Sequence, residues 1–223
     1  IRTIRLILLL SIVTVNVGIA QHVMNANPNR KKVAALVYDH TVQIDYIPAL
    51  GIFMASGQMS DFETYTIGES DTLLSMGGEK ILTRYTLSNA PRPDILVVPG
   101  GEWSGYNKES PLIQYIIEQH QKGTIILSVC TGAYLLAKAG LLDNLESTSL
   151  HVQLDLLQKL APKTRVVKKD FVDNGSIITA AGDATGIDAA LSLLSRIAGP
   201  DKAKWVAEVY MDYQHYKPRS AIK

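Results

Sequence analysis

The chain of 223 residues has very little cysteine: Cys130 is the only one, so the chain cannot form a disulfide with itself. In an exported protein, an unpaired cysteine forms a bridge to another chain, is a buried inert thiol or is a reactive thiol. The sequence also lacks internal repeats, low-complexity tracts and any stretch that resembles a linker between domains. With 47% hydrophobic and 19% charged residues, the chain is expected to form one globular domain with a well-buried core.

Surplus positive charge is absent once the N-terminal segment is set aside. Residues 1–20 hold two of the 22 basic residues and none of the 21 acidic ones. The remainder therefore has 20 basic and 21 acidic residues and a formal net charge of −1. This balance gives no electrostatic basis for binding nucleic acid, and no nucleic-acid partner is expected.

The first twenty residues have the pattern of a secretory signal peptide. Arg2 and Arg5 precede an apolar run, and the small residues Gly18 and Ala20 occupy the −3 and −1 positions of a cleavage site before Gln21. The alternative is an uncleaved membrane anchor, but a helical span needs about 20 apolar residues and the run is shorter. We therefore expect a periplasmic or secreted protein that contacts the membrane only through this segment. Residues 21–31 are interpreted as a flexible lead-in to a domain over residues 32–216.

Sequence patterns typical of metal-binding and phosphate-binding sites are missing as well. The five histidines show no metal-ligand spacing. The glycine pair at 100–101 continues as Glu-Trp-Ser-Gly, which does not match a phosphate-binding loop. No metal or cofactor is expected, and the expected partner is a small-molecule substrate.

What the sequence does contain is a regular alternation of buried strands and helices. Apolar, β-branched runs at 31–39, 93–101 and 124–129 predict strands that are buried on both faces. Strands alternating with helices indicate a mainly parallel sheet covered by helices on both sides. Helices are expected at 44–56, 111–122, 131–139, 151–160, 186–199 and 201–216, and further strands at 62–68, within 72–87 around Gly77-Gly78, and within 164–182 around an Asn174-Gly175 turn.

Several residues with chemical potential follow these strands directly. Asp45, the pair Gly100-Gly101, Cys130 and Asp183 each come after a predicted strand. In open α/β sheets, ligands bind beyond the carboxyl ends of the strands. The pattern therefore predicts that these residues meet at one edge of the sheet.

Cys130 stands between a strand and a helix in "TIILSVCTGAYLL". A tight turn of this kind exposes a nucleophile at the edge of a sheet, and Gly132 allows close approach of the backbone. The helix N-terminus is expected to lower the thiol pKa below its usual ~8.5. The amides of Thr131 and Gly132 are expected to face a developing oxyanion. The alternative is a buried structural cysteine, because free cysteine is among the most buried residue types.

Three segments, "PDILVVPGG", "SVCTGAYLLAKAGLLD" and "DNGSIITAAGDATGIDAALSLLSRIAG", resemble the DJ-1/PfpI (ThiJ/PfpI) superfamily, which has the class I glutamine amidotransferase-like fold. The resemblance covers about residues 31–200 and is strongest to the branch of isocyanide hydratase and the ligand-binding halves of AraC-type regulators. It implies an α/β, flavodoxin-like three-layer sandwich with a mainly parallel sheet and a cysteine nucleophile elbow. Homodimers are common in the superfamily, so a homodimer is a possible assembly.

The resemblance also implies roles for individual residues. Cys130 matches the nucleophile, and Asp45 matches an acidic residue that faces the thiol. One amide of Gly100 or Gly101 is implied to serve the oxyanion site. A carboxyl close to a thiolate should have a raised pKa, so that it stays protonated and can donate to the substrate. The alternative for Asp45 is a plain helix cap.

The sequence departs from the superfamily at three positions. Thr131 follows Cys130 where protease-like and amidotransferase-like members have a histidine. In "STSLH", Leu150 takes the position of a histidine, and His151 comes one residue later, which favours a side chain that points away from the site. Asp183 lies in a loop that is usually apolar, where it either tunes the choice of substrate or caps a helix that begins near Thr185.

These observations favour a cofactor-free, cysteine-dependent enzyme, an isocyanide hydratase-like lyase acting on a small electrophile. The alternative is a small-molecule-binding or redox-sensing module of the same fold without turnover. AraC-type regulators add a helix-turn-helix pair after this domain, and no such pair is recognised before Lys223.

Overall fold

A seven-stranded, mainly parallel sheet forms the centre of the computed structural model, which describes residues 29–56 and 61–213. The strand order is β10-β11-β7-β6-β1-β2-β5, and every neighbouring pair is parallel except β10 and β11. The strands are β1 (Lys31–Val37), β2 (Phe62–Gly68), β5 (Tyr85–Thr86), β6 (Ile95–Val98), β7 (Ile125–Val129), β10 (Phe171–Asp173) and β11 (Ile177–Ala180).

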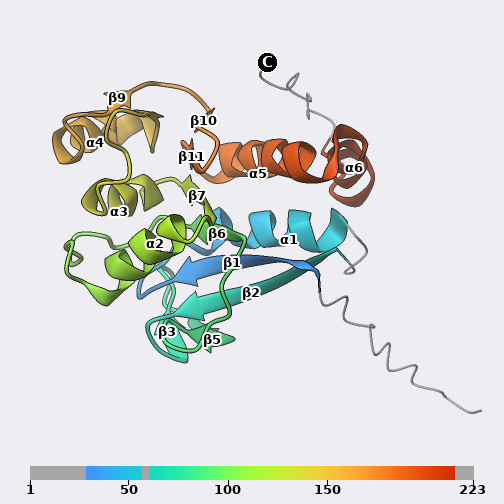
Figure 1. Ribbon diagram of the computed structural model, residues 1–223, viewed down its shortest axis with the longest axis horizontal. Coiled ribbons are helices and arrows are strands. Elements are labelled where there is room, and N and C mark those ends of the chain that lie inside the picture. The colour runs from blue at the N-terminus through green and yellow to red at the C-terminus, as the bar shows by residue number, and fades with distance from the viewer. Residues whose placement is uncertain (1–28, 57–60, 214–223) are drawn as a thin grey trace, which may run out of the picture.

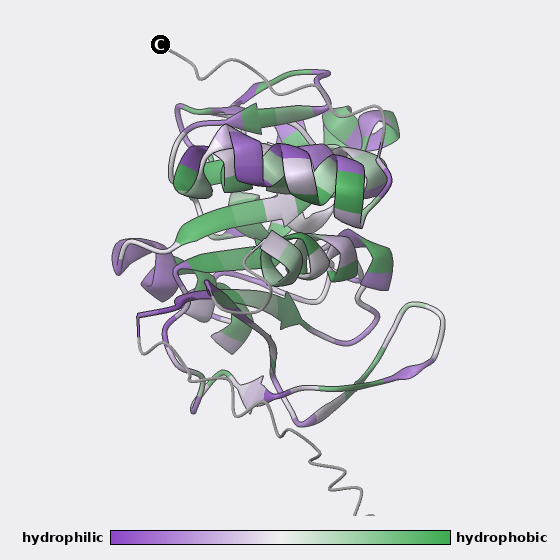
Figure 2. Ribbon diagram, turned by 90° about the vertical axis from the view of Figure 1, so that its right-hand side faces the viewer, coloured by the Kyte–Doolittle hydropathy of each residue, from purple (hydrophilic) through white to green (hydrophobic). Residues whose placement is uncertain are grey.

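Helices cover both faces of this sheet and complete the predicted three-layer sandwich (Figure 1). One layer contains α1 (Ile47–Ser56), α5 (Asp183–Ala198) and α6 (Pro200–Trp205), and the other contains α2 (Pro111–Gln121), α3 (Gly132–Lys138) and α4 (Leu154–Leu160). Figure 2 shows the apolar strands enclosed between the more polar helices. In β1, Val33 and Ala35 face the first layer while Ala34 and Leu36 face the second, and all four are fully buried. Burial on both faces explains why the strands are continuous apolar runs.

Short strands and short turns of 3-10 helix lie outside the central sheet and the main helices. A hairpin of β3 (Thr72–Leu74) and β4 (Lys80–Leu82) turns at the predicted glycine pair, and β8 (Glu146–Ser147) pairs in parallel with β9 (Arg165–Val166). Short turns of 3-10 helix, η1 (Gln43–Asp45) and η2 (His151–Gln153), precede α1 and α4.

Several helix boundaries differ from those expected. The helices expected from residues 44 and 151 begin at Ile47 and Leu154, each after a turn of 3-10 helix. The helix expected from residue 186 begins three residues earlier, at Asp183. The helix expected over 201–216 is α6 followed by one π-helical turn, η3 (Val206–Tyr210), and residues 214–216 lie outside the described part of the chain.

The expected signal peptide and most of the lead-in, within residues 1–28, also lie outside the described residues. Within 29–56 and 61–213, none of the helices has both the length and the apolar character needed to cross a bilayer.

Candidate active site

Cys130 forms a strained elbow between β7 and α3. Its φ is +55°, in the left-handed region that few residues other than glycine adopt. Two hydrogen bonds hold this backbone: the Cys130 amide donates to the Ala180 carbonyl at 3.0 Å, and the Ser149 hydroxyl donates to the Cys130 carbonyl at 2.7 Å. The turn projects a half-buried side chain from the carboxyl end of β7, in agreement with the predicted elbow.

Gly132 lets α3 begin directly against β6. A Cβ atom at this position would overlap the carbonyl oxygen of Val98 and lie 2.9 Å from that of Pro99. Both obstacles are backbone atoms, so a side chain could be accommodated only by moving the helix away from the sheet. The requirement for close backbone approach, predicted from the sequence, is therefore present.

Asp45 is buried beside this elbow. It is only 2% exposed, and its Oδ2 accepts a hydrogen bond from the Gly100 amide at 2.8 Å. The carboxyl thus connects η1 to the loop after β6 instead of capping the helix that follows it, which overturns the helix-cap alternative. Its Oδ1 is buried and has no hydrogen-bond donor among the described residues.

The side chains of Asp45, Thr131 and Cys130 converge on Gly100. A Cβ atom on Gly100 would lie 2.7 Å from Asp45 Oδ2, 2.8 Å from Thr131 Oγ1 and 3.1 Å from Cys130 Cβ. Only glycine leaves room for the three side chains to meet. The structure therefore brings together four of the residues predicted for the site.

The amides of the two glycines have partners that the sequence did not predict. Gly100 donates to Asp45, as described, and the Gly101 amide donates to Thr131 Oγ1 at 3.1 Å. Neither amide is therefore free for a developing oxyanion in this arrangement, contrary to the role expected for one of them. They hold the carboxyl and the hydroxyl in place, while the amide and hydroxyl of Thr131 hydrogen-bond to the Cys130 sulfur.

The environment of Cys130 favours the neutral thiol. Burial raises the pKa of Cys130 to about 11, and the negative charges of Asp45 and Asp183 act in the same direction. Hydrogen bonds from Thr131 oppose this rise only in part. The expectation of a pKa lowered by the helix N-terminus is therefore wrong, because desolvation and two neighbouring carboxyls outweigh it.

Asp45 titrates close to neutrality. Burial, followed by the Asp183 carboxyl, raises its pKa from 3.8 to about 7, and the hydrogen bond from Gly100 acts against both. The direction agrees with the expectation of a protonated carboxyl. The cause differs, because burial and Asp183 produce the rise and a thiolate does not.

Asp183 lies at the site, and His151 lies outside it. Asp183 is the exposed first residue of α5 and acts on both Asp45 and Cys130. It does not cap a helix beginning near Thr185; instead, the Gly182 amide donates to Thr185 Oγ1 at 2.9 Å at the start of α5. The His151 ring is 3.0 Å from a backbone carbonyl of the segment before β10 and is not among the groups that act on the thiol.

Two residues of the site were missed by sequence reasoning. Ser149, which fixes the elbow carbonyl, lies in the "STSLH" segment that was considered only for its histidine. Tyr38, at the end of β1, donates from its hydroxyl to the Pro99 carbonyl at 2.9 Å. Burial raises the pKa of Tyr38 well above its ordinary value, so it faces the site as a neutral group. The signal for Tyr38 that the sequence offered was a tyrosine directly after an apolar strand of the core.

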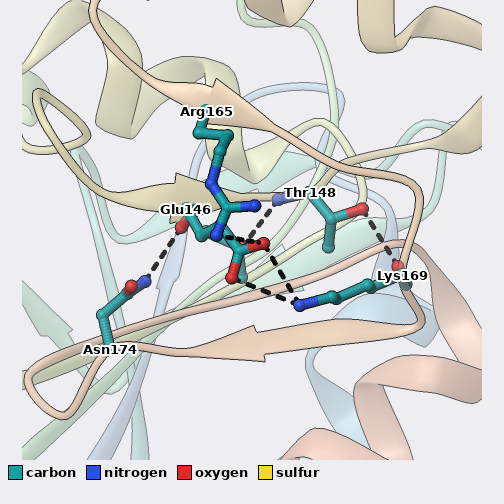
Figure 3. Close-up of polar contacts among 6 residues, drawn as sticks. Glu146, Thr148, Arg165, Lys169 and Asn174 are labelled. Carbon is teal, nitrogen blue, oxygen red and sulfur yellow. Dashed lines mark hydrogen bonds and ion pairs between the residues drawn. The ribbon is translucent and has the colours of Figure 1, made fainter.

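A separate cavity lies between β8, β9 and the turn after β10, with a volume of about 410 Å³. Its lining residue Glu146 pairs with Arg165 at 2.9 Å and with Lys169 at 3.1 Å (Figure 3). The cavity contains neither Cys130 nor Asp45. In the described ranges, no group of three or more His, Cys, Asp and Glu residues is placed to hold a metal ion. The cavity is lined by Asn144, Leu145, Glu146, Lys163, Arg165 and Asn174.

Comparisons with known proteins agree with this architecture. The family model described as the DJ-1/PfpI family matches residues 31–196. The isonitrile hydratase of Pseudomonas putida is 27% identical over 178 residues, which cover 79% of this chain and 77% of that protein. The HTH-type transcriptional regulator GbdR of Pseudomonas aeruginosa is 24% identical and is matched over 83% of this chain but only 52% of its own length. The crystal structure of a THiJ/PfpI family protein from Pseudomonas syringae superposes with a TM-score of 0.74 at 24% identity, covering 87% of this chain and 79% of that one.

Proposed function

We propose, from the premise that the chain belongs to the DJ-1/PfpI family, that it is a cysteine-dependent enzyme that adds water to a small neutral electrophile of the isocyanide class. One observation carries the proposal: a half-buried thiol on a strained elbow and a buried carboxyl with an unpartnered oxygen converge on Gly100. A nucleophile next to a group that can move a proton is the minimum equipment for covalent catalysis. The match to an isonitrile hydratase supports this choice of substrate class.

The two titrating groups fit a reaction that begins from a neutral thiol. At neutral pH Cys130 retains its proton, while Asp45, with a pKa of about 7, is present in both forms. A carboxylate at Asp45 accepts the thiol proton as the sulfur attacks, and the resulting carboxylic acid returns it to the substrate. A proton carrier whose pKa lies near the working pH is the most effective one.

The proposed reaction has two balanced steps. In the first, a bond forms between Cys130 Sγ and the terminal carbon of the isocyanide, and the thiol proton passes through Asp45 to that carbon, which gives a thioimidate. In the second, water adds to the same carbon, the nitrogen gains a proton, the C–S bond breaks and the thiol is restored. The product is an N-substituted formamide, and one water is consumed. The amide and hydroxyl of Thr131 stabilise negative charge on the sulfur.

The test uses cyclohexyl isocyanide as the probe and formamide production followed by NMR. Cys130→Ser should abolish turnover, and Asp45→Asn should lower kcat by about 100-fold or more, the range of a lost proton carrier. Asp155→Asn, which changes an exposed carboxyl in the first turn of α4, is the matched control and should leave the rate unchanged. Wild-type turnover in Cys130→Ser would refute a covalent role for the thiol.

A second candidate, a binding module without turnover, is favoured by the match to a transcriptional regulator over part of its length. In that case, calorimetry would detect binding of cyclohexyl isocyanide, and NMR would show no conversion to the formamide. A redox-sensing role is less well supported, because an oxidation sensor needs a high thiolate fraction and burial acts against it here.

Export remains part of the proposal and rests on residues 1–20 alone. Expression with an initiator methionine in a Gram-negative host should yield a periplasmic protein whose N-terminus, by mass spectrometry, is Gln21. A cytosolic, unprocessed chain would contradict this part. Analytical ultracentrifugation of the mature protein tests the possible homodimer.

A further inference from the structure

A second carboxyl, Asp183, reaches the site from the first residue of α5. β11 pairs with β7 in a register that places Ala180 beside Val129, so the chain leaves both strands at the same edge. Cys130 follows one strand, and Asp183 follows the other as the first residue of α5. Since α5 also packs against η1, which contains Asp45, the fold places the two carboxyls against each other.

The hydrogen bonding of the buried Asp45 carboxyl indicates how it interacts with Asp183. Oδ2 accepts from Gly100 at 2.8 Å, while Oδ1 has no N–H or O–H donor among the described residues. Asp45 is only 2% exposed, so an unpartnered oxygen is costly there. The carboxyl of Asp183 is the side chain that acts on Asp45, by a hydrogen bond and by its charge. Two carboxyls can hydrogen-bond only when one of them holds a proton.

The other titratable groups around Asp45 are neutral near pH 7. Tyr38, from the end of β1, and Cys130, from the elbow, both have pKa values raised by burial. No lysine, arginine or histidine of the described ranges is among the groups that act on Asp45. The negative charge at the site therefore belongs to the two carboxyls, and desolvation favours the proton on buried Asp45.

We propose that Asp183 is a positioning residue that forms an acid pair with Asp45, in which one proton is shared between the two carboxyls and resides on Asp45. The pair itself follows from the placement of η1, α5 and the unpartnered oxygen. Its catalytic consequence rests on the proposed function: by raising the pKa of Asp45, Asp183 makes the Asp45 carboxylate a stronger base toward the Cys130 thiol without touching the substrate.

The experiment measures the carboxyl directly, without any substrate. Protein labelled with ¹³C at the aspartate carboxyls is titrated by NMR, with Asp45→Asn identifying the resonance. In Asp183→Asn, the amide donates to Asp45 Oδ1 and removes the like charge, so the pKa of Asp45 should fall by about one unit or more, the coupling expected of interacting sites. Asp183→Ala should lower it in the same direction, and Asp155→Asn should leave it unchanged. An Asp45 titration that is the same in wild type and in both Asp183 variants would overturn the acid pair.

A second readout connects the pair to turnover. With cyclohexyl isocyanide, the acidic limb of the kcat/KM profile should move to lower pH in Asp183→Asn, while KM changes little; a purely structural role would not move the limb. If the wild type binds but does not convert the isocyanide, and the NMR shift is still seen, the proposed function fails and the acid pair stands. If turnover is present but neither the limb nor the NMR titration moves, the acid pair fails and the proposed function stands.

Discussion

Asp45→Asn should make the protein more stable at alkaline pH while removing activity. Burial raises the pKa of Asp45 from 3.8 to about 7 in the folded protein, so the folded state binds this proton more tightly than the unfolded state. Stability contributed by the group is therefore present below the unfolded pKa and is lost as pH rises through the folded pKa. The window runs from about pH 4 to pH 7, and stability is level above it.

The magnitude follows from the difference between the two pKa values. A rise of about 3 at about 1.4 kcal/mol per unit gives a penalty of ~4 kcal/mol for wild type above pH 7. Asparagine carries no charge, its oxygen can still accept from the Gly100 amide, and its amide can donate toward Asp183. The variant should therefore be more stable than wild type by up to ~4 kcal/mol at pH 8, and this advantage should shrink by about 3 kcal/mol at pH 5.

Urea denaturation at pH 5 and pH 8 measures this prediction, with the slope of the transition checked for equality between proteins. Asp155→Asn is again the control, and its difference from wild type should not depend on pH in this window. If Asp45→Asn destabilises the protein at pH 8, or if its advantage does not change between the two pH values, the raised pKa of the buried carboxyl is wrong.

Alkylation of Cys130 by iodoacetamide should titrate near pH 11, the value to which burial raises the thiol pKa; a midpoint near 9 would contradict the desolvated thiol. Gly132→Ala should destabilise the fold by about 3 kcal/mol or more in urea denaturation, because its methyl group overlaps a carbonyl oxygen of β6. Gly51→Ala in α1, where nothing lies within 4 Å of the added carbon, should instead stabilise by up to ~1 kcal/mol, and similar effects of the two changes would refute the packing argument. Ser149→Ala should destabilise the elbow by about 1–2 kcal/mol, seen as faster amide exchange at Cys130; unchanged exchange would show that the hydroxyl does not hold the turn.

The layers and the elbow could be predicted from the sequence because they depend on local patterns. Strands buried on both faces are continuous apolar runs, and the runs before Gly100 and Cys130 are of this kind. A glycine two residues after the cysteine indicates close approach of the backbone, which the contact between Gly132 and β6 bears out. The place of Asp45 depended on the family resemblance, because no local pattern distinguishes a buried carboxyl from a helix cap.

The protonation of the site could not be predicted from the sequence, because it depends on groups that are distant along the chain. The helix N-terminus next to Cys130 is visible in the sequence and favours a thiolate. Burial, Asp45 and Asp183 reverse its effect, and their proximity exists only after η1, β7 and α5 are assembled. The same holds for the glycine amides, whose partners are a carboxyl 55 residues away and a hydroxyl 30 residues away.

A site that combines a protonated thiol with a carboxyl whose pKa is about 7 suits some reactions better than others. The proton that leaves Cys130 can be accepted by Asp45 and returned to the product, so a hydration cycle requires no net exchange of protons with solvent. A hydrolase that must expel an amine needs a group that is a strong acid donor late in the reaction, the role that histidine has in a Cys-His pair. Here the His151 ring contacts the Lys169 carbonyl, and among the described residues the buried carboxyl that acts on the thiol is Asp45, whose pKa is about 7. Addition to a neutral carbon that itself accepts the proton is the chemistry that this arrangement supports best.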